Sequence, residues 1–506
     1  MRIDRPIIAG LLVMAGALAP RQAAAQARVA LASAAPRPQA CRPVADPARL
    51  PVRGARLRMA PATYSISGRR FTTNVYNGRF LGPTLTMAPG ERVDLSVVNA
   101  MRETNSQPAA MTAWTNLHYH GHVETPSPDS GDNVTHVHVN RGAPPRRFHF
   151  PVPEYHTTGM FWYHPHPHGI SSSQVAGGLS GALLVGSILK YFPQYEGVRE
   201  RVLLIRDMSF DLMESPVVLN VNGSTCAVLP VAPGERQLWH IGNFGANTFV
   251  NLKLEGMRWT LLALDGNPLA EATEVDSLWL PPGTRAEVIV TGPAAGQRVR
   301  LFSAPFAPRD SVPVTLGWVV GQGRAPSPRP LRTLAGADAG ILDTVRALRE
   351  ATDVQRHTFR FTFPGETTAA INDSIYEPTH LPVTIPWGKV QEWTIVNQTG
   401  SLHTFHIHQT DFLVTSVNGQ PADEGLLRDN VPVGVHRDST GKVVGDTVVV
   451  RFAFHPIAAG PFVFHCHVLQ HEDEGMMHNV CVYDPDDPDG VSKCNAMFSG
   501  AAPHGG

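Results

Sequence analysis

The chain has 506 residues, more than one ordinary hydrophobic core accommodates, so two to four domains are expected. Its formal net charge of −1 excludes the strongly basic surface with which proteins bind nucleic acid or anionic membranes. The hydrophobic content of 42% suits a folded globular protein.

The first 27 residues have the pattern of an export signal. Two arginines lie within the first six residues, an apolar run follows over residues 7–19, and small residues come next. This run has the length of a signal peptide's hydrophobic segment and is too short to cross a membrane. We therefore expect residues 1–27 to be removed and the mature protein to be exported, periplasmic or secreted, without a membrane anchor. An uncleaved anchor is the alternative.

Short runs of β-branched and apolar residues, bounded by Gly, Pro, Asn and Asp, recur along the rest of the chain and predict β-sandwiches. A turn followed by a strand that ends in asparagine occurs at residues 89–99, 233–243 and 387–397. This repeat predicts three similar units.

Composition suggests where these units end. Residues 323–334 are rich in Pro and Arg, and apolar residues at helical spacing follow over 341–351. Residues 326–354 are therefore interpreted as a linker with a short helix. Residues 486–506 are rich in Asp, Pro and Gly and are expected to form a flexible tail. The three units are assigned to residues 45–190, 191–325 and 355–485.

Histidines recur in pairs of the form His-x-His. Side chains two residues apart in a strand point to the same face, so each pair can direct two imidazoles to one side. The eight histidines together are enough to hold three copper ions. The pairs are His118 and His120, His164 and His166, His406 and His408, and His465 and His467.

Cys466 lies between the two histidines of the last pair and would point to the opposite face of the same strand. His471 and Met476 follow within a short loop. Two histidines, one cysteine and a weakly bound methionine make up the ligand set of a blue-copper electron-transfer centre. Zinc is the rival metal, but it seldom calls for eight paired histidines beside such a set.

These motifs, in this order, resemble those of the three-domain multicopper oxidases of the bacterial laccase-like type. The resemblance extends over residues 45–485 and implies an all-β fold of three cupredoxin-like Greek-key β-sandwich domains. It also implies four copper ions. The type 1 ion would be held by His403, Cys466, His471 and Met476, the type 2 ion by His118 and His406, and the type 3 pair by His120, His164, His166, His408, His465 and His467.

The same resemblance implies an enzyme that takes electrons one at a time from phenols or aromatic amines and reduces dioxygen to water. His471 would receive each electron, which then passes through Cys466 to His465 and His467. Bilirubin-type substrates or metal ions are alternative reductants. A copper-free scaffold of the same fold is the alternative from another class, and retention of every ligand argues against it.

Dioxygen reduction consumes protons, so an acid is expected near the cluster. The family keeps an aspartate in the loop after the first His-x-His motif, and Asp132 matches it best, with Asp129 as second choice. An ordinary turn aspartate is the alternative. Many relatives carry glutamate before the second type 1 histidine, where this chain has Gln470. We therefore expect protons to arrive through water or another carboxylate.

Four cysteines remain, namely Cys41, Cys226, Cys481 and Cys494. An exported chain permits disulfides, and four cysteines allow three pairings. We favour Cys41 with Cys494, with free thiols as the alternative. His122, His136 and His138 are interpreted as surface or packing residues.

Overall fold

The computed structural model describes residues 41–499, except residues 67–68, 105–106, 130, 209–217, 307–311, 325–338 and 423–424. The predicted export signal and the first part of the predicted linker lie outside the described residues. Among the residues that are described, no helix is long and apolar enough to cross a membrane.

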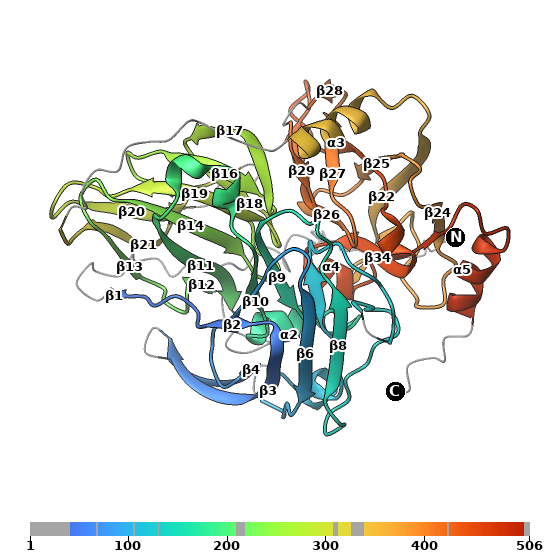
Figure 1. Ribbon diagram of the computed structural model, residues 1–506, viewed down its shortest axis with the longest axis horizontal. Helices are drawn as coiled ribbons and strands as arrows, with labels where there is room; N and C mark the ends of the chain where they lie inside the picture. Colours follow the sequence, from blue (N-terminus) through green and yellow to red (C-terminus); the bar gives the residue numbers. More distant parts are fainter. Residues whose placement is uncertain are drawn as a thin grey trace, which may run out of the picture.

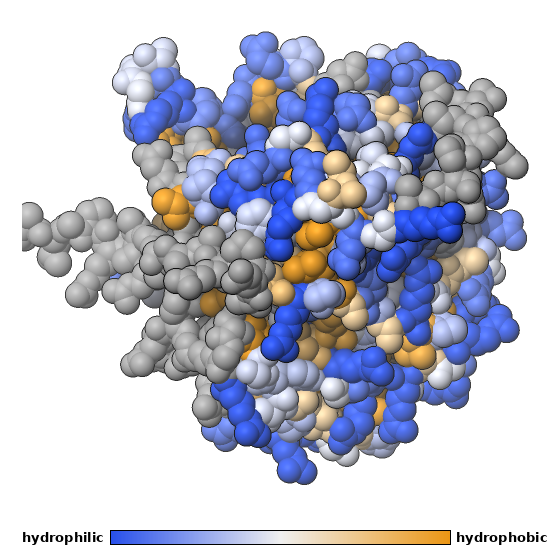
Figure 2. All heavy atoms as spheres, turned by 90° about the vertical axis from the view of Figure 1, so that its left-hand side faces the viewer, coloured by the Kyte–Doolittle hydropathy of each residue, from blue (hydrophilic) through white to orange (hydrophobic). Residues whose placement is uncertain are grey.

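The described chain forms three β-sandwiches, each built from two sheets, and the predicted all-β class is confirmed (Figure 1). Strand β6 (Arg92–Asn99) shows why these sequences form sandwiches. Val93, Leu95 and Val97 are buried, and the residues between them are more exposed. This alternation places one face of the sheet on a core. On the face drawn in Figure 2, hydrophilic residues surround smaller hydrophobic areas.

The first sandwich holds the first two His-x-His pairs. Its strands are β2 (Arg49–Pro51), β3 (Arg53–Ile66), β4 (Arg69–Tyr76), β5 (Thr84–Met87), β6, β7 (His118–His120), β8 (Arg146–Pro151), β9 (Gly159–His164) and β10 (Gly181–Val185). One sheet has the order β2-β5-β10-β9-β7 and the other β4-β3-β6-β8. Leu57, Leu95, Phe150 and Leu183, drawn from both sheets, share one core.

The second, middle sandwich carries none of the paired histidines. Its strands are β1 (Arg42–Pro43), β11 (Arg199–Met208), β12 (Val218–Val221), β13 (Ala227–Val231), β14 (Arg236–Asn243), β15 (Val250–Leu254), β16 (Trp259–Leu264), β17 (Asn267–Val275), β18 (Leu278–Leu280), β19 (Arg285–Thr291), β20 (Arg298–Ser303) and β21 (Val314–Gly321). The sheet orders are β1-β13-β21-β20-β15-β18 and β12-β11-β14-β19-β16-β17.

The third sandwich holds the remaining histidine pairs and Cys466. Its strands are β22 (Gln355–Gly365), β23 (Thr368–Ile371), β24 (Val383–Pro386), β25 (Gln391–Asn397), β26 (His403–Ile407), β27 (Phe412–Val417), β28 (Gln420–Pro421), β29 (Leu427–Arg428), β30 (Asn430–Val433), β33 (Thr447–Phe452), β34 (Gly460–Cys466) and β35 (Met477–Tyr483). Strands β31 (Val435–Arg437) and β32 (Val443–Gly445) form a separate pair. One sheet has the order β23-β22-β25-β33-β27-β28, with β29 beside β27, and the other β24-β35-β34-β26-β30.

Helices are short and connect the strands. They are η2 (Ala109–Thr112), α2 (Ser171–Gly177), η3 (Ile188–Lys190), η4 (Pro193–Tyr195), α3 (Ala339–Glu350), η5 (Pro456–Ala458), α4 (Leu469–Asp473) and α5 (Gly490–Ser499). Helix α3 lies where apolar spacing predicted a helix over residues 341–351.

The three sandwiches repeat one strand arrangement. In each, an early strand pairs in parallel with the strand of the repeated motif: β3 with β6, β11 with β14, and β22 with β25. The motif strands end at Asn99, Asn243 and Asn397, and each asparagine donates its side-chain amide to a backbone carbonyl of its own sandwich. The repeat seen in the sequence therefore corresponds to a repeated structural unit.

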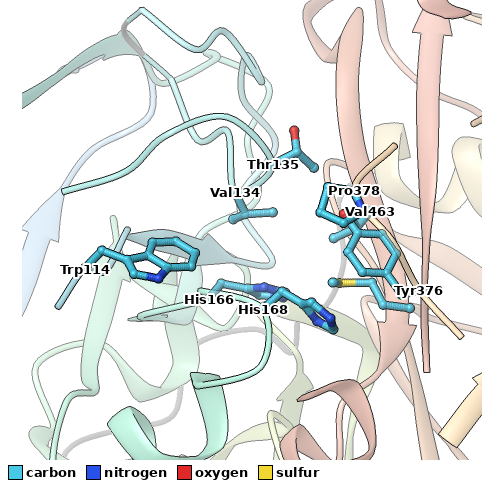
Figure 3. Close-up of a pocket in the computed structure, with 9 residues that line it drawn as sticks. Trp114, Val134, Thr135, His166, His168, Tyr376, Pro378 and Val463 are labelled. Atoms are coloured by element: carbon cyan, nitrogen blue, oxygen red, sulfur yellow. The ribbon is translucent and has the colours of Figure 1, made fainter. Parts of the chain in front are cut away.

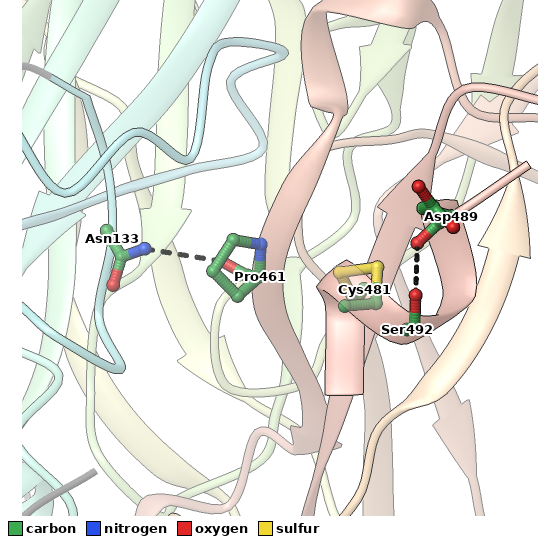
Figure 4. Close-up of a disulfide and its surroundings, with 6 residues drawn as sticks. Asn133, Pro461, Cys481, Asp489 and Ser492 are labelled. Atoms are coloured by element: carbon green, nitrogen blue, oxygen red, sulfur yellow. Dashed lines mark hydrogen bonds between the residues drawn. A yellow bond between two sulfur atoms is a disulfide. The ribbon is translucent and has the colours of Figure 1, made fainter. Parts of the chain in front are cut away.

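The favoured pairing of Cys41 with Cys494 is wrong. The structure joins Cys41 to Cys226. It joins Cys481 to Cys494, and Figure 4 shows the surroundings of Cys481. Strand β1 pairs in parallel with β13, and this pairing brings Cys41, just before β1, next to Cys226, just before β13. Helix α5 folds back onto β35 and brings Cys494 to Cys481.

The prediction of a flexible tail over residues 486–506 is also wrong for residues 490–499; residues 500–506 lie outside the described residues. Residues Gly490–Ser499 form helix α5, and Cys494 and Phe498 are buried against the third sandwich. Composition alone missed this helix because its stability comes from the disulfide and from tertiary packing rather than from helix propensity.

Candidate metal centres

Cys466 lies at the end of β34 and is buried between two histidines. Its Sγ is 3.4 Å from His403 Nδ1 and 3.6 Å from His471 Nδ1, and these two nitrogens are 3.2 Å apart. Met476 is buried in the same core cluster, and its carbonyl accepts a hydrogen bond from the Cys466 amide at 3.0 Å. We call these four residues the Cys466 site.

The chemistry of the Cys466 site suits a bound metal ion. Burial raises the pKa of Cys466 to about 12 and lowers the pKa of His403 well below its usual value. The free site would therefore hold a neutral thiol beside neutral imidazoles. A cation that stabilises the thiolate and accepts imidazole nitrogens supplies the missing charge.

The eight paired histidines come from β7, β9, β26, β34 and the residues just after them, and they converge between the first and third sandwiches. Strands β9, β26 and β34 lie near the middle of Figure 1. His166 Nε2 and His408 Nε2 lie 3.0 and 3.3 Å from His465 Nε2. His467 Nε2 lies 3.1 Å from His120 Nδ1. Two nitrogens that bind one metal ion at about 2.0 Å stand roughly 3 Å apart. The distances between these nitrogens therefore allow neighbouring histidines to bind the same metal ion. We call the eight paired histidines the eight-histidine site.

The remaining nitrogens of this site also fit metal binding. His118 Nε2, His164 Nε2 and His406 Nε2 are buried and have no hydrogen-bond partner among the described residues. Burial, with smaller contributions from neighbouring histidines, holds the pKa of His118 and of His406 well below the usual value. The rings are therefore neutral, and each offers a lone pair to a metal ion.

Hydrogen bonds on the outer nitrogens fix which nitrogen faces the centre. His118 Nδ1 donates to Asp132 Oδ2 at 2.6 Å, and His406 Nδ1 donates to the Asp429 carbonyl at 2.6 Å. His164 Nδ1 donates to the Pro165 carbonyl at 2.8 Å. Such partners orient a metal-binding histidine and set its tautomer.

Asp132 lies beside the eight-histidine site, next to His118. Its Oδ2 also accepts a hydrogen bond from the Tyr119 amide at 2.9 Å. Burial raises the pKa of Asp132 to about 7, and burial also raises the pKa of the adjacent Glu124 well above its usual value. The second choice, Asp129, is exposed. The geometry therefore favours Asp132 over Asp129 as an acid near the cluster.

The structure adds an acid that sequence reasoning missed. Glu472, in α4, is fully buried and lies 3.4 Å from both His166 Nδ1 and His465 Nδ1. Ser171 Oγ donates to Glu472 Oε1 at 2.9 Å. Burial raises the pKa of Glu472 well above its usual value. In the sequence, Glu472 could have been singled out because it directly follows His471.

Gln470 does not face the eight-histidine site. It is exposed, and its side chain donates to Glu474 Oε1 at 2.9 Å. Gln470 therefore cannot supply a proton to this site. Glu472, two residues further along, places a carboxylate there instead.

Other histidines that the sequence offered lie outside the two centres, although one of them is close to His166. His122 is buried and its ring lies 4.2 Å from that of His156, whereas His136 and His138 are exposed. His168 lines a small pocket between the first and third sandwiches, together with His166 and Met477 (Figure 3).

An all-β fold that places a buried set of Cys, His and Met beside eight paired histidines is typical of copper redox proteins. Three family models, each described as multicopper oxidase, match residues 58–188, 191–303 and 343–486. The chain belongs to the multicopper oxidase family.

Known proteins are similar over most of the chain. A multicopper oxidase of Staphylococcus aureus is 24% identical over 427 residues, which cover 80% of this chain and 83% of the relative. The cell division protein FtsP of Pectobacterium atrosepticum is 25% identical over 483 residues, which cover 87% and 93%. The solved structure of a bacterial laccase-like multicopper oxidase, CueO from Ochrobactrum sp., superimposes with a TM-score of 0.70 at 22% identity, covering 87% of this chain and 100% of that one. The predicted cupredoxin-like fold is thereby confirmed.

Proposed function

We propose that this chain is a laccase-like enzyme that oxidises phenols or aromatic amines at the Cys466 site and reduces dioxygen to water at the eight-histidine site. The proposal rests on the end of β34 and the residue after it, because these three residues contribute to both sites. Cys466 contacts His403 and His471 on one side, and His465 and His467 join the eight-histidine site on the other.

The Cys466 site would hold one copper ion through His403, Cys466, His471 and Met476. The eight-histidine site would hold three, one on His118 and His406 and two on His120, His164, His166, His408, His465 and His467. Copper supplies one-electron redox chemistry at the first site and electron transfer to dioxygen at the second.

The protein's own residues connect the two sites. His403 Nε2 is hydrogen-bonded to Thr399 Oγ1 at 2.7 Å and is fully buried, whereas His471 keeps a slight exposure. His471 is therefore the edge through which a reductant would deliver electrons. Cys466 is joined covalently to His465 and His467, so the path between the sites is a few bonds long.

Two acids flank the eight-histidine site from different sandwiches. Asp132 contacts His118, and Glu472 contacts His166 and His465. With pKa values raised by burial, both can hold a proton near neutral pH and release it where dioxygen is reduced. The small pocket of Figure 3 borders His166, one of the eight paired histidines.

The test is copper quantitation combined with oxygen uptake. The chain, loaded with copper and dialysed, should hold about four copper ions, show an intense blue colour, and consume oxygen with phenols. A panel of phenols, bilirubin, Cu(I) and Mn(II) would identify the reductant. A protein that stays colourless after loading would refute the proposal and favour a copper-free scaffold.

Met476 should tune the potential of the Cys466 site. A weak axial methionine lowers the potential relative to a side chain that does not bind. Met476→Leu is therefore expected to raise the potential, measured by redox titration of the blue colour. Met477→Leu is a matched control, because Met477 packs in a different cluster with Val134 and Tyr376. Equal potentials in the parent and Met476→Leu would argue against axial binding.

We also propose that the mature chain is exported, in the periplasm or secreted, because disulfides such as the two found here persist mainly in oxidising compartments.

We propose unit boundaries at residues 45–190, 191–325 and 355–485, and the ranges of the strands in the three sandwiches support them.

A further inference from the structure

The middle sandwich reaches the eight-histidine site through buried charges. Four residues, which we call the arginine–aspartate network, are buried: Asp265 and Arg285 from the middle sandwich, and Arg428 and Asp429 from the third. Arg285 Nη1 and Nη2 donate to Asp429 Oδ1 and Oδ2 at 2.8 and 2.6 Å. Arg428 Nε donates to Asp265 Oδ2 at 3.3 Å. Each arginine of this network thus has an aspartate partner away from water.

Arg285 is held in one orientation by all three sandwiches. Its Nε donates to the Met160 carbonyl of the first sandwich at 3.1 Å, and its Nη1 donates to the Gly283 carbonyl at 3.1 Å. A Cβ at Gly121, the residue after His120, would overlap both the Asp429 carboxylate and the Arg285 guanidinium. The planar fork of arginine matches a carboxylate bidentately, which lysine cannot reproduce.

Asp429 in turn touches two histidines of the eight-histidine site. Its Oδ1 accepts a hydrogen bond from His120 Nε2 at 3.2 Å, and its carbonyl accepts one from His406 Nδ1 at 2.6 Å. The two imidazole rings stack with their centroids 3.8 Å apart. A neutral imidazole carries one N–H. When His120 donates from Nε2, its Nδ1 is free to face the centre, where it lies 3.1 Å from His467 Nε2.

We propose that Arg285, from the middle sandwich, is a positioning residue for the copper cluster. By fixing the Asp429 carboxylate, it sets the tautomer and orientation of His120, so that this histidine binds copper through Nδ1. The inference rests on the proposed function. The middle sandwich, which carries none of the paired histidines, would then help to orient one of them.

A merely structural arginine is available as a matched control. Arg206, in β11 of the same sandwich, is also fully buried and also bridges to the first sandwich. It donates to the carbonyls of Phe80 and Val175 at 3.0 and 2.9 Å. Neither carbonyl belongs to a paired histidine or to Asp429. Arg206→Lys therefore reports the cost of altering a buried arginine that does not hold Asp429.

The experiment loads the parent, Arg285→Lys and Arg206→Lys with Cu(II) and titrates each with a chelator. Retained copper, the blue colour and the unfolding temperature of the copper-free chain are measured. Loss of an outer partner of a metal-binding histidine typically weakens metal binding about 10- to 100-fold. Arg285→Lys should therefore release cluster copper at correspondingly lower chelator concentration while its blue colour persists. Arg206→Lys should retain copper like the parent, even if it unfolds at a lower temperature.

A paired variant covers the case in which Arg285→Lys does not fold. Arg285→Met combined with Asp429→Leu leaves no unpaired charge from this pair, an exchange that buried ion pairs often tolerate. It should fold, remain blue, and lose cluster copper selectively. Parent-like retention of copper in either Arg285 variant would overturn the inference and leave the proposed function standing. A parent that binds no copper would refute both.

Discussion

Replacement of Cys466 by serine should remove the blue colour and reduce oxidation of phenols to the level of copper-free protein. The thiolate would be the ligand that defines the Cys466 site. Its sulfur contacts His471, and its backbone is joined covalently to His465 and His467. A serine hydroxyl is nearly the same size but is a poor copper ligand. The measurement is visible absorption together with oxygen uptake.

The eight-histidine site supplies the control for Cys466→Ser. Because its ligands are unchanged, the variant should still retain about three copper ions. A buried hydroxyl without a partner costs about 1–3 kcal/mol, so the variant should fold. A variant that stays blue, or that oxidises phenols at the parent's rate, would contradict the assignment of Cys466.

Replacement of Asp132 by asparagine should slow oxygen reduction by about 10²- to 10⁴-fold, the usual contribution of a positioned acid or base. Anaerobic bleaching of the blue colour by a phenol should be unchanged, because Asp132 contacts His118 and not the Cys466 site. The two steps can be separated by following bleaching without oxygen and then recolouring when oxygen is admitted. Asp129→Asn is the matched control, since Asp129 is an exposed aspartate of the same loop.

The pH dependence gives Asp132→Asn a sharper signature. Burial raises the pKa of Asp132 to about 7, so the carboxyl holds a proton below about pH 7 and loses it above. Reoxidation of the parent should therefore slow as the pH rises through about 7. The asparagine variant cannot ionise and should lack this decline. Identical pH profiles for the two proteins would assign the proton donor elsewhere, with Glu472 the next candidate.

Much of the metal chemistry could be predicted from the sequence because it depends on local periodicity. Strand residues alternate between faces, so the spacing of His465, Cys466 and His467 already separates a sulfur from two imidazoles. The repeated turn and strand ending at Asn99, Asn243 and Asn397 likewise predicted three similar sandwiches.

Features that depend on which distant segments meet could not be predicted in the same way. Cys41 pairs with Cys226 because β1 joins β13 across 185 residues of sequence, and helix α5 exists because it packs on β35. Gln470 and Glu472 are two residues apart, yet one faces solvent and the other the eight-histidine site. Only the direction of α4 against the first sandwich distinguishes them.

The sequence by itself determined which side chains could bind a metal, their pairing along strands and the all-β class, since these follow from side-chain chemistry and a two-residue repeat. Tertiary structure alone decided which nitrogens approach within about 3 Å of one another, which acids lie beside them, and that an arginine of the middle sandwich contacts Asp429. The physical reason is that these distances are set by the docking of three separately built sandwiches, and no local pattern records how their surfaces meet.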